Sequence, residues 1–202
     1  MAWTIEPLPT AGSRFEAALS VYREAFSRPP YSDSERVNEV RARIAAQHGR
    51  RPGFRAFCAM HGDGRVLGMT YGYRSEPGQW WHEAVAAAIG AEDYATWLSD
   101  AYELAEVAVA PAFQSFGIGR ALIEHLLSGV TERSCVLSTR SDSNAHRLYR
   151  RIGFDEITEM QFFTGGYPFF IMGRPLHPMQ ADVKDDTTGD RLGLLSRAAA
   201  TG

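Results

Sequence analysis

Residues 107–122 read VAVAPAFQSFGIGRAL and form the most informative stretch of the chain. An alternating apolar run, residues 104–109, leads into it, and an amphipathic run, residues 118–127, leads out of it. We therefore predict a strand, a tight glycine turn and the start of a helix in direct succession. The first turn of a helix presents unpaired backbone N–H groups and the positive end of the helix dipole. Because glycines let a ligand approach that backbone closely, the stretch predicts a site for a phosphate or pyrophosphate.

Two widespread phosphate-binding loops do not match this turn. A P-loop needs Gly-Lys-Ser/Thr after its glycines, and here Gly119 is followed by Arg120. The dinucleotide fingerprint needs a third glycine at position 122, which is Leu122. For the loop on its own, an ordinary strand-to-helix turn with glycines for packing remains the alternative.

The turn resembles the coenzyme A loop of the GNAT acyltransferases, whose usual form is V-x-P-x-x-[RQ]-x-x-G-x-[GA]. A second segment, 30 residues after the loop glutamine, resembles the N-x-x-x-x-Y-x-x-x-G-F segment of the same family. Two motifs in the right order make the resemblance specific, and it implies acetyl-CoA as the co-substrate. The matching residues are Val109, Pro111, Gln114, Gly117 and Gly119 in the loop, and Asn144, Tyr149, Gly153 and Phe154 in the second segment.

Composition limits the class of protein. The chain has 202 residues, 45% of them hydrophobic, which suits one globular domain with a real core. A net charge of −3 without any Lys/Arg run argues against a nucleic-acid partner. The N-terminus does not resemble a signal peptide, and no apolar run approaches the roughly 20 residues that span a bilayer. Cys58 and Cys135 lie in apolar runs, so we expect buried free thiols in a cytoplasmic protein, and we leave a homodimer open.

The predicted elements alternate in the order β-α-α-β-β-insertion-β-α-β-α-β-β. This order indicates an α/β fold with a mixed, mostly antiparallel central sheet flanked by helices. The resemblance implies the GNAT fold. We assign residues 1–176 to one acetyltransferase domain, with an aromatic-rich helical insertion at 77–100, and residues 177–202 to a flexible tail. The predicted strands cover residues 3–8, 55–60, 66–73, 104–109, 135–139, 154–163 and 169–172, and the helices 13–26, 35–47, 118–127 and 144–152.

Acetyl transfer to an amine requires a group that removes the amine proton. For an amine with a pKa near 10.4, deprotonation at pH 7 costs about 4–5 kcal/mol. Glu103 and Glu106 are the carboxylates near the strand, and we expect them on opposite faces because strand side chains alternate. The resemblance favours Glu103, since histone-type members carry the base glutamate 11 residues before the loop Gln, here Gln114. The alternatives are a solvated strand-end charge for Glu103 and a structural or substrate-facing carboxylate for Glu106.

Tyr149 is the candidate acid, because a phenol can give a proton to a departing thiolate. The resemblance implies that its hydroxyl points at the coenzyme sulfur; the alternative is a core tyrosine of an amphipathic helix. The resemblance also implies that Asn144 contacts the pantetheine arm or an ordered water. For Asn144 the alternative is a plain helix N-cap, and both roles are compatible.

The same resemblance assigns the remaining coenzyme contacts. It implies that Val107 and Val109 pair through their backbones with the pantetheine amides. The side chain of Arg120 either meets a phosphate or is solvated. No histidine or cysteine spacing is typical of a metal site, so no metal is expected. The residues expected to cradle the pyrophosphate are Gln114, Ser115, Phe116, Gly117, Ile118, Gly119 and Arg120.

The sequence therefore predicts an acetyl-CoA-dependent N-acetyltransferase that acts on the primary amine of a small molecule by direct attack in a ternary complex. The alternatives are a protein N-terminal or lysine acetyltransferase and a non-catalytic acyl-CoA-binding module. The insertion carries Trp80, Trp81, Tyr94 and Trp97, which form either a packing helix pair or a wall of the acceptor pocket. An aromatic wall suits apolar, aromatic or cationic acceptors.

Overall fold

A seven-stranded sheet forms the centre of the computed structural model, which describes residues 2–176. The strand order is β1-β2-β3-β4-β5-β7-β6, and every neighbouring pair is antiparallel except β4 and β5. The predicted mixed, mostly antiparallel α/β fold is confirmed, whereas the predicted tail at 177–202 lies outside the described residues. The strands are β1 (Trp3–Pro7), β2 (Arg55–His61), β3 (Val66–Ser75), β4 (Ala101–Val109), β5 (Ser134–Arg140), β6 (Asp155–Gln161) and β7 (Pro168–Pro175).

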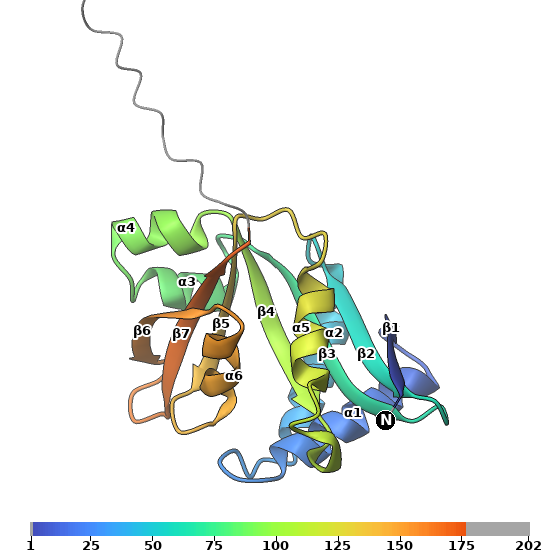
Figure 1. The fold of residues 1–202 in the computed structure, drawn as a ribbon. Coiled ribbons are helices and arrows are strands. Elements are labelled where there is room, and N and C mark those ends of the chain that lie inside the picture. Colours follow the sequence, from blue (N-terminus) through green and yellow to red (C-terminus); the bar gives the residue numbers. More distant parts are fainter. Residues whose placement is uncertain (1, 177–202) are drawn as a thin grey trace, which may run out of the picture.

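Helices cover both faces of this sheet. In Figure 1, α5 and α6 lie in front of the sheet, and α1 and α2 lie behind it. The longer helices turn an apolar stripe inward; in α1, for example, Phe15, Leu19, Tyr22 and Phe26 are all buried. The helices are α1 (Ser13–Phe26), α2 (Arg36–Ala46), α3 (Trp80–Ala86), α4 (Ala91–Asp93), α5 (Ile118–Leu127) and α6 (Ala145–Arg151), with short turns η1 (His48–Arg50), η2 (Tyr94–Leu98) and η3 (Pro111–Phe113).

The insertion between β3 and β4 consists of α3, α4 and η2, as short helices were predicted there. Trp81 of α3 and Leu98 of η2 pack with Val136 of β5 and Ile171 of β7 in one buried cluster. The indole of Trp97 lies so close to Gly173 of β7 that a Cβ there would be 2.5 Å from the ring. The insertion therefore covers the β5–β7 half of the sheet, and Gly173 makes this close packing feasible.

The sheet opens between β4 and β5. Their parallel pairing joins only Ala101, Tyr102 and Glu103 to Ser134, Cys135 and Val136. Beyond Glu103 the two strands diverge, as Figure 1 shows, and no later residue of β4 pairs with β5 among the described residues. The outer part of β4 therefore has a free backbone edge on its β5 side.

An extra residue interrupts the pairing of β4 with β3. Tyr71 pairs with Glu106, but the next residue, Gly72, pairs with Leu104, so Ala105 has no partner on β3. Such a bulge shifts the alternation of side chains by one residue. The prediction that Glu103 and Glu106 point to opposite faces is therefore wrong: both side chains line one cavity.

Two further properties concern the whole described chain. Cys58 and Cys135 are buried free cysteines, as predicted. No helix within residues 2–176 is long and apolar enough to cross a bilayer.

Candidate active site

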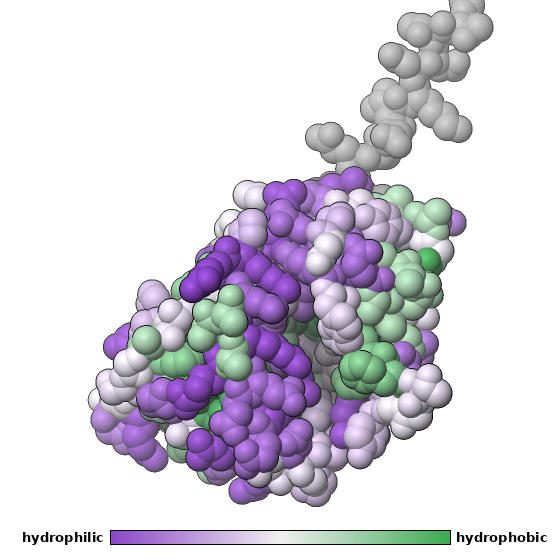
Figure 2. Space-filling view, turned by 180° about the vertical axis from the view of Figure 1, so that it is seen from behind, coloured by the Kyte–Doolittle hydropathy of each residue, from purple (hydrophilic) through white to green (hydrophobic). Residues whose placement is uncertain are grey.

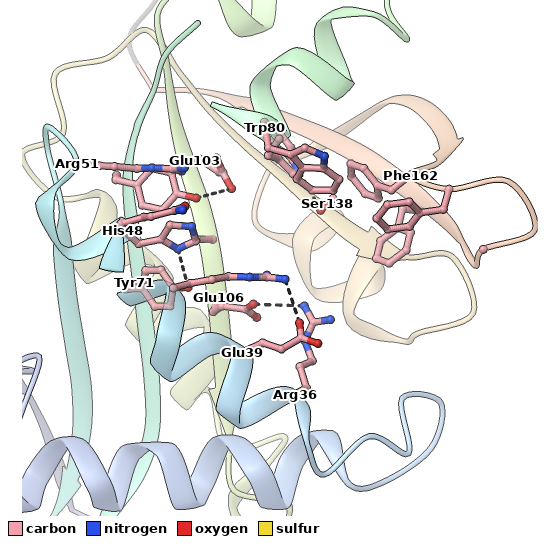
Figure 3. Close-up of a pocket in the computed structure, with 18 of the residues that line it drawn as sticks. Arg36, Glu39, His48, Arg51, Tyr71, Trp80, Glu103, Glu106, Ser138 and Phe162 are labelled. Carbon is pink, nitrogen blue, oxygen red and sulfur yellow. Dashed lines mark hydrogen bonds and ion pairs between the residues drawn. The ribbon is translucent and has the colours of Figure 1, made fainter. Parts of the chain in front are cut away.

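A cavity of about 560 Å³ lies on the sheet face that α1 and α2 cover. Its walls come from α2 and the residues after it, from β3 and β4, from α3, and from the connection between β6 and β7. Figure 2 shows this face, where a hollow separates a mainly hydrophilic half from a half in which hydrophobic side chains gather. Figure 3 shows the lining side chains, with charged groups on one side and aromatic rings on the other.

Glu103 is a buried carboxylate, 5% exposed, in the floor of this cavity. Its Oε1 accepts a hydrogen bond of 3.0 Å from the Tyr73 hydroxyl, while its Oε2 has no hydrogen-bond partner among the described residues. Burial raises the pKa of Glu103 to about 7, against the opposing effects of the Tyr73 hydrogen bond and the Arg51 charge. At neutral pH this carboxyl group is poised to take up a proton.

Glu106 has a different environment, although it lines the same cavity. Its Oε2 accepts a hydrogen bond of 3.0 Å from the Tyr22 hydroxyl, and its Oε1 lies 3.3 Å from Arg36 Nη2. The Tyr22 hydroxyl in turn accepts a bond of 2.7 Å from Arg36 Nε. The negative charge of Glu106 raises the pKa of Arg36, so the guanidinium stays charged. Both oxygens of Glu106 are thus engaged, which leaves Glu103 as the carboxylate with a free oxygen.

Tyrosine rings from β3 and the imidazole of His48 from η1 lie around the two carboxylates of β4. The Tyr71 hydroxyl lies 3.1 Å from His48 Nδ1, and the guanidinium of Arg51 lies over the Tyr73 ring at 4.4 Å. Burial, together with the charges of Arg51 and Arg43, lowers the pKa of His48 to about 4. The imidazole is therefore neutral near pH 7 and contributes no charge to the cavity.

The opposite wall of the cavity is aromatic. Trp80 is 58% exposed, and its ring centroid lies 5.3 Å from that of Phe162 and 6.0 Å from that of Phe163. Trp81 is buried, and its Nε1 donates a hydrogen bond of 3.1 Å to Ser138 Oγ on β5. The insertion and the β6–β7 connection thus meet in one aromatic wall beside the carboxylates.

Tyr149 of α6 lies on the other sheet face, in the core cluster beside the opening between β4 and β5. Its ring meets Phe154 edge-on, with centroids 5.8 Å apart. Burial raises the pKa of Tyr149, and the nearby groups of Tyr31, Glu106 and Cys135 act in the same direction. The phenol is therefore protonated across the physiological range and available as a donor.

The glycine turn begins α5, as the sequence predicts. Gly117 is the N-cap residue with φ of 84°, and the first hydrogen bond of the helix runs from the Ala121 N–H to the Gly117 carbonyl. Among the described residues, the four N–H groups of residues 117–120 have no acceptor. A Cβ at Gly117 would meet nothing within 4 Å, so the space around the turn is open. The first turn of α5 thus meets the requirements of an anion site.

Other predicted coenzyme residues surround the open edge of β4. The Ala110 N–H donates to the Leu67 carbonyl of β3 at 2.9 Å. Because N–H direction alternates along a strand, the backbone groups of Val107 and Val109 face away from β3, toward the opening. Gln114 Nε2 donates to the Val109 carbonyl at 3.1 Å, so the loop glutamine helps to hold the turn against β4.

The remaining predicted residues are exposed. Ser115 has a positive φ of 68°, Phe116 is 62% exposed, and the Arg120 side chain makes no hydrogen bond or ion pair with a described residue. Asn144 precedes α6, but its side chain makes no capping bond; the Ser143 hydroxyl accepts from the Ala145 N–H instead. Asn144 therefore occupies the N-cap position of α6, as the alternative had it, but does not cap the helix through its side chain.

The basic side of the cavity, formed by Arg36, Arg43 and Arg51 beside the neutral His48, was not predicted from the sequence. One signal was present: Arg36, Glu39 and Arg43 recur at helical spacing, which places them on one face of α2. No local sequence pattern indicates that this face of α2 packs against β4, because Arg36 and Glu106 are 70 residues apart. Within residues 2–176, no group of three or more His, Cys, Asp or Glu side chains is arranged to hold a metal ion.

Known proteins match this chain in sequence and in fold. The acetyltransferase (GNAT) domain family matches residues 54–156. A GCN5-like protein acetyltransferase of Mycobacterium tuberculosis is 31% identical, over 81% of this chain and 92% of its own length.

Solved structures resemble the fold over most of its length. A Corynebacterium glutamicum structure titled histone acetyltransferase HPA2 and related acetyltransferase has a TM-score of 0.62 at 21% identity, covering 89% of this chain and 99% of its own. The ribosomal-protein-S18-alanine N-acetyltransferase of Escherichia coli has a TM-score of 0.57 at 22% identity, covering 96% and 100%. By sequence and fold together, the chain belongs to the GNAT acetyltransferase family and is an acyltransferase.

Proposed function

We propose that the protein transfers the acetyl group of acetyl-CoA to the primary amine of a small molecule, by direct attack in a ternary complex. The observation that carries this proposal is Glu103, a buried carboxylate that lines an aromatic-walled cavity beside the opening between β4 and β5 and whose Oε2 has no hydrogen-bond partner among the described residues. A base in a confined cavity of about 560 Å³ suits a small acceptor, because pockets of this size hold small ligands.

The coenzyme would occupy the features around the opening. Its pyrophosphate would bind the free N–H groups of residues 117–120, with Gln114, Ser115 and Phe116 forming the turn before them. Its pantetheine arm would pair with the backbone of Val107 and Val109, as an added strand pairs with a sheet edge. This path brings the thioester into the opening, between the cavity on one sheet face and Tyr149 on the other.

The reaction follows from these positions. The amine nitrogen forms a bond to the thioester carbonyl carbon, and the C–S bond breaks with its electron pair moving to sulfur. Glu103 Oε2 takes the proton that the amine loses, directly or through one water molecule. The Tyr149 hydroxyl donates a hydrogen bond to the departing sulfur. A thiol has a reference pKa near 8.5, which is below the pKa of Tyr149. The phenol therefore keeps its proton and stabilises the thiolate through this hydrogen bond.

The second candidate function is acetylation of a protein. The observation that favours it is the name of the relative from Mycobacterium tuberculosis, a protein acetyltransferase. A lysine side chain is itself a primary amine and could enter the cavity. The rings of Trp80, Phe162 and Phe163 line the same cavity as Glu103, and this aromatic lining supports a small acceptor.

A thiol-release assay with acetyl-CoA distinguishes the two functions. The panel contains small primary amines, lysine-containing peptides and peptides with a free N-terminus, all at equal concentration. We expect higher kcat/KM for at least one class of small amine than for any peptide. Preferred turnover of a peptide would reject the small-amine proposal and favour the second candidate.

A further inference from the structure

Most charged side chains that line the cavity are paired with one another. Arg43 Nη2 donates to Glu39 Oε2 at 3.0 Å, and Arg36 Nη2 lies 3.3 Å from Glu106 Oε1. These two pairs leave no net charge for a ligand to neutralise.

One cation and one carboxylate of the lining lack such a partner. Within residues 2–176, no carboxylate lies at ion-pair distance from Arg51, whose Nη1 makes a single long hydrogen bond of 3.4 Å to Gln79. A guanidinium has five N–H donors, so most donors of Arg51 have no protein acceptor there. Glu103 likewise has one oxygen without a partner.

Arg51 and Glu103 are held by the same side chain. The Arg51 guanidinium lies over the ring of Tyr73 at 4.4 Å, and the Tyr73 hydroxyl donates to Glu103 at 3.0 Å. The side chain of Tyr73 therefore lies between the unpaired guanidinium of Arg51 and the unpaired carboxylate oxygen of Glu103. Figure 3 shows Arg51 and Glu103 on the left side of the cavity. A ligand with a cation and an anion on adjoining atoms would match this arrangement.

We propose that the acceptor is a small α-amino acid, with its carboxylate bound by Arg51 and its amine facing Glu103. The inference rests on the proposed small-amine function and names its substrate class. A planar guanidinium binds a carboxylate through two parallel hydrogen bonds, which orients the ligand as well as attracting it. Bound in this way, the α-amine lies next to the free oxygen of Glu103.

The aromatic wall determines which amino acids fit. Trp80, Phe163 and Tyr167 all line the cavity, yet they are 58%, 70% and 59% exposed. Large aromatic surfaces left open at the rim of a cavity favour an apolar or aromatic group of the ligand. The side chain of the amino acid would therefore be apolar or aromatic and would cover these rings.

Matched pairs of acceptors test the role of the carboxylate. Phenylalanine with phenethylamine, tryptophan with tryptamine and leucine with isoamylamine differ within each pair only in that group. We expect at least tenfold higher kcat/KM for the amino acid of the preferred pair. Substituting Arg51→Gln should lower kcat/KM for that amino acid by about 10- to 100-fold, mainly through KM, and should leave its amine counterpart nearly unchanged.

Two further variants control for charge and folding. Arg43→Gln removes a lining cation that is already paired with Glu39, so the ratio within each pair should stay at the wild-type value. Arg51→Lys keeps the charge but loses the planar fork, and should retain part of the preference. A thermal melt of each variant verifies that it folds.

The outcomes separate this inference from the proposed function. Equal kcat/KM within the pairs, or a ratio that Arg51→Gln leaves unchanged, overturns the role of Arg51. If no amino acid is acetylated while other small amines release thiol, the amino-acid inference is wrong and the small-amine function stands. If no small amine of any kind reacts, both are wrong.

Discussion

Burial and hydrogen bonding shift the pKa of the Glu103 carboxyl group in opposite directions. Burial penalises the charged form, whereas the Tyr73 hydroxyl and the Arg51 guanidinium favour it. The balance raises its pKa to about 7. A general base works best with a pKa near the operating pH, so this environment suits proton abstraction.

We predict that Glu103→Gln lowers kcat/KM by roughly 10²- to 10⁴-fold, the usual contribution of a general base. In the wild type, kcat/KM should rise as pH increases through about 7, because only the deprotonated carboxylate accepts a proton. The variant should lose this rise. A wild-type profile that is flat between pH 6 and 8 would reject Glu103 as the base.

The same substitution has an effect on stability that is independent of catalysis. The pKa of Glu103 is raised in the folded state, so the protonated carboxyl group stabilises the fold. This stabilisation is fully present below about pH 4.5 and is lost as the pH rises through about 7. At pH 8 the glutamine variant should therefore gain unfolding free energy relative to the wild type, on the order of 3 kcal/mol, and little of this gain should remain at pH 4. Glu106→Gln is the control. It should destabilise the protein at pH 8, because it removes the charged partner of Arg36.

We predict that Tyr149→Phe lowers kcat and leaves the dissociation constant of acetyl-CoA within a small factor. The substitution removes only the hydroxyl and keeps the ring that packs against Phe154. Steady-state kinetics and calorimetry measure the two quantities separately. An unchanged kcat from pH 7 to 9 would make Tyr149 a core residue and assign thiolate stabilisation to water.

Motif spacing identified Glu103, Glu106 and Tyr149 as candidates, and these residues do lie around the opening between β4 and β5. It could not separate the roles of the two glutamates. Their difference depends on Tyr22, 84 residues before Glu106, and on Tyr73, 30 residues before Glu103. Such contacts form only when the sheet and helices assemble, and no local pattern encodes them.

At the level of elements, periodicity predicted most strands and helices within a few residues. The helix at 13–26 has the predicted bounds, since α1 runs from Ser13 to Phe26. The bulge at Ala105 escaped prediction, because it depends on how β4 pairs with β3, a strand distant in the sequence. That one residue is what brings both glutamates to the same face.

The turn before α5 gives a prediction with a matched control on the same helix. Gly117 and Gly129 flank α5, have φ of 84° and 80°, and would each place a Cβ in open space. Substituting either by valine should cost about 1–2 kcal/mol of unfolding free energy, through backbone strain alone. Only Gly117→Val should also weaken acetyl-CoA binding, because only Gly117 begins the proposed pyrophosphate site.

Calorimetric titration with acetyl-CoA and denaturant melts measure both quantities for the two variants. Equal acetyl-CoA affinities in Gly117→Val and Gly129→Val would place the pyrophosphate elsewhere.

On the scale of the whole molecule, the aromatic wall joins segments from distant parts of the sequence. Trp80 belongs to the insertion and Phe162 to the β6–β7 connection, and they meet at 5.3 Å. The sequence indicated a cluster of aromatic residues in the insertion but not its partner. A cavity wall built from two surface segments is a property of the assembled fold.

We predict that Trp80→Ala raises the acceptor KM and leaves the acetyl-CoA KM within a small factor. Trp80 is largely exposed, so its loss should cost little stability. Trp81→Ala should instead cost roughly 3–5 kcal/mol, because Trp81 is buried and bonded to Ser138. Kinetics at varied acceptor and varied acetyl-CoA test the first expectation. Equal changes in both KM values in a folded Trp80→Ala variant would contradict a role in acceptor binding.

The opening between β4 and β5 has a consequence for hydrogen exchange at the backbone amides of β4. Within residues 2–176, β4 and β5 share only three residue pairs, so the amides of Val107 and Val109 lack a strand partner on that side, while the amide of Ala108 faces β3. In deuterated buffer we expect fast exchange at Val107 and Val109 and slow exchange at Ala108. Saturation with acetyl-CoA should slow the first two by orders of magnitude and should barely change the third. The co-substrate would then complete the protected core of the protein, so that cooperative protection extends across the whole sheet only while the enzyme is loaded.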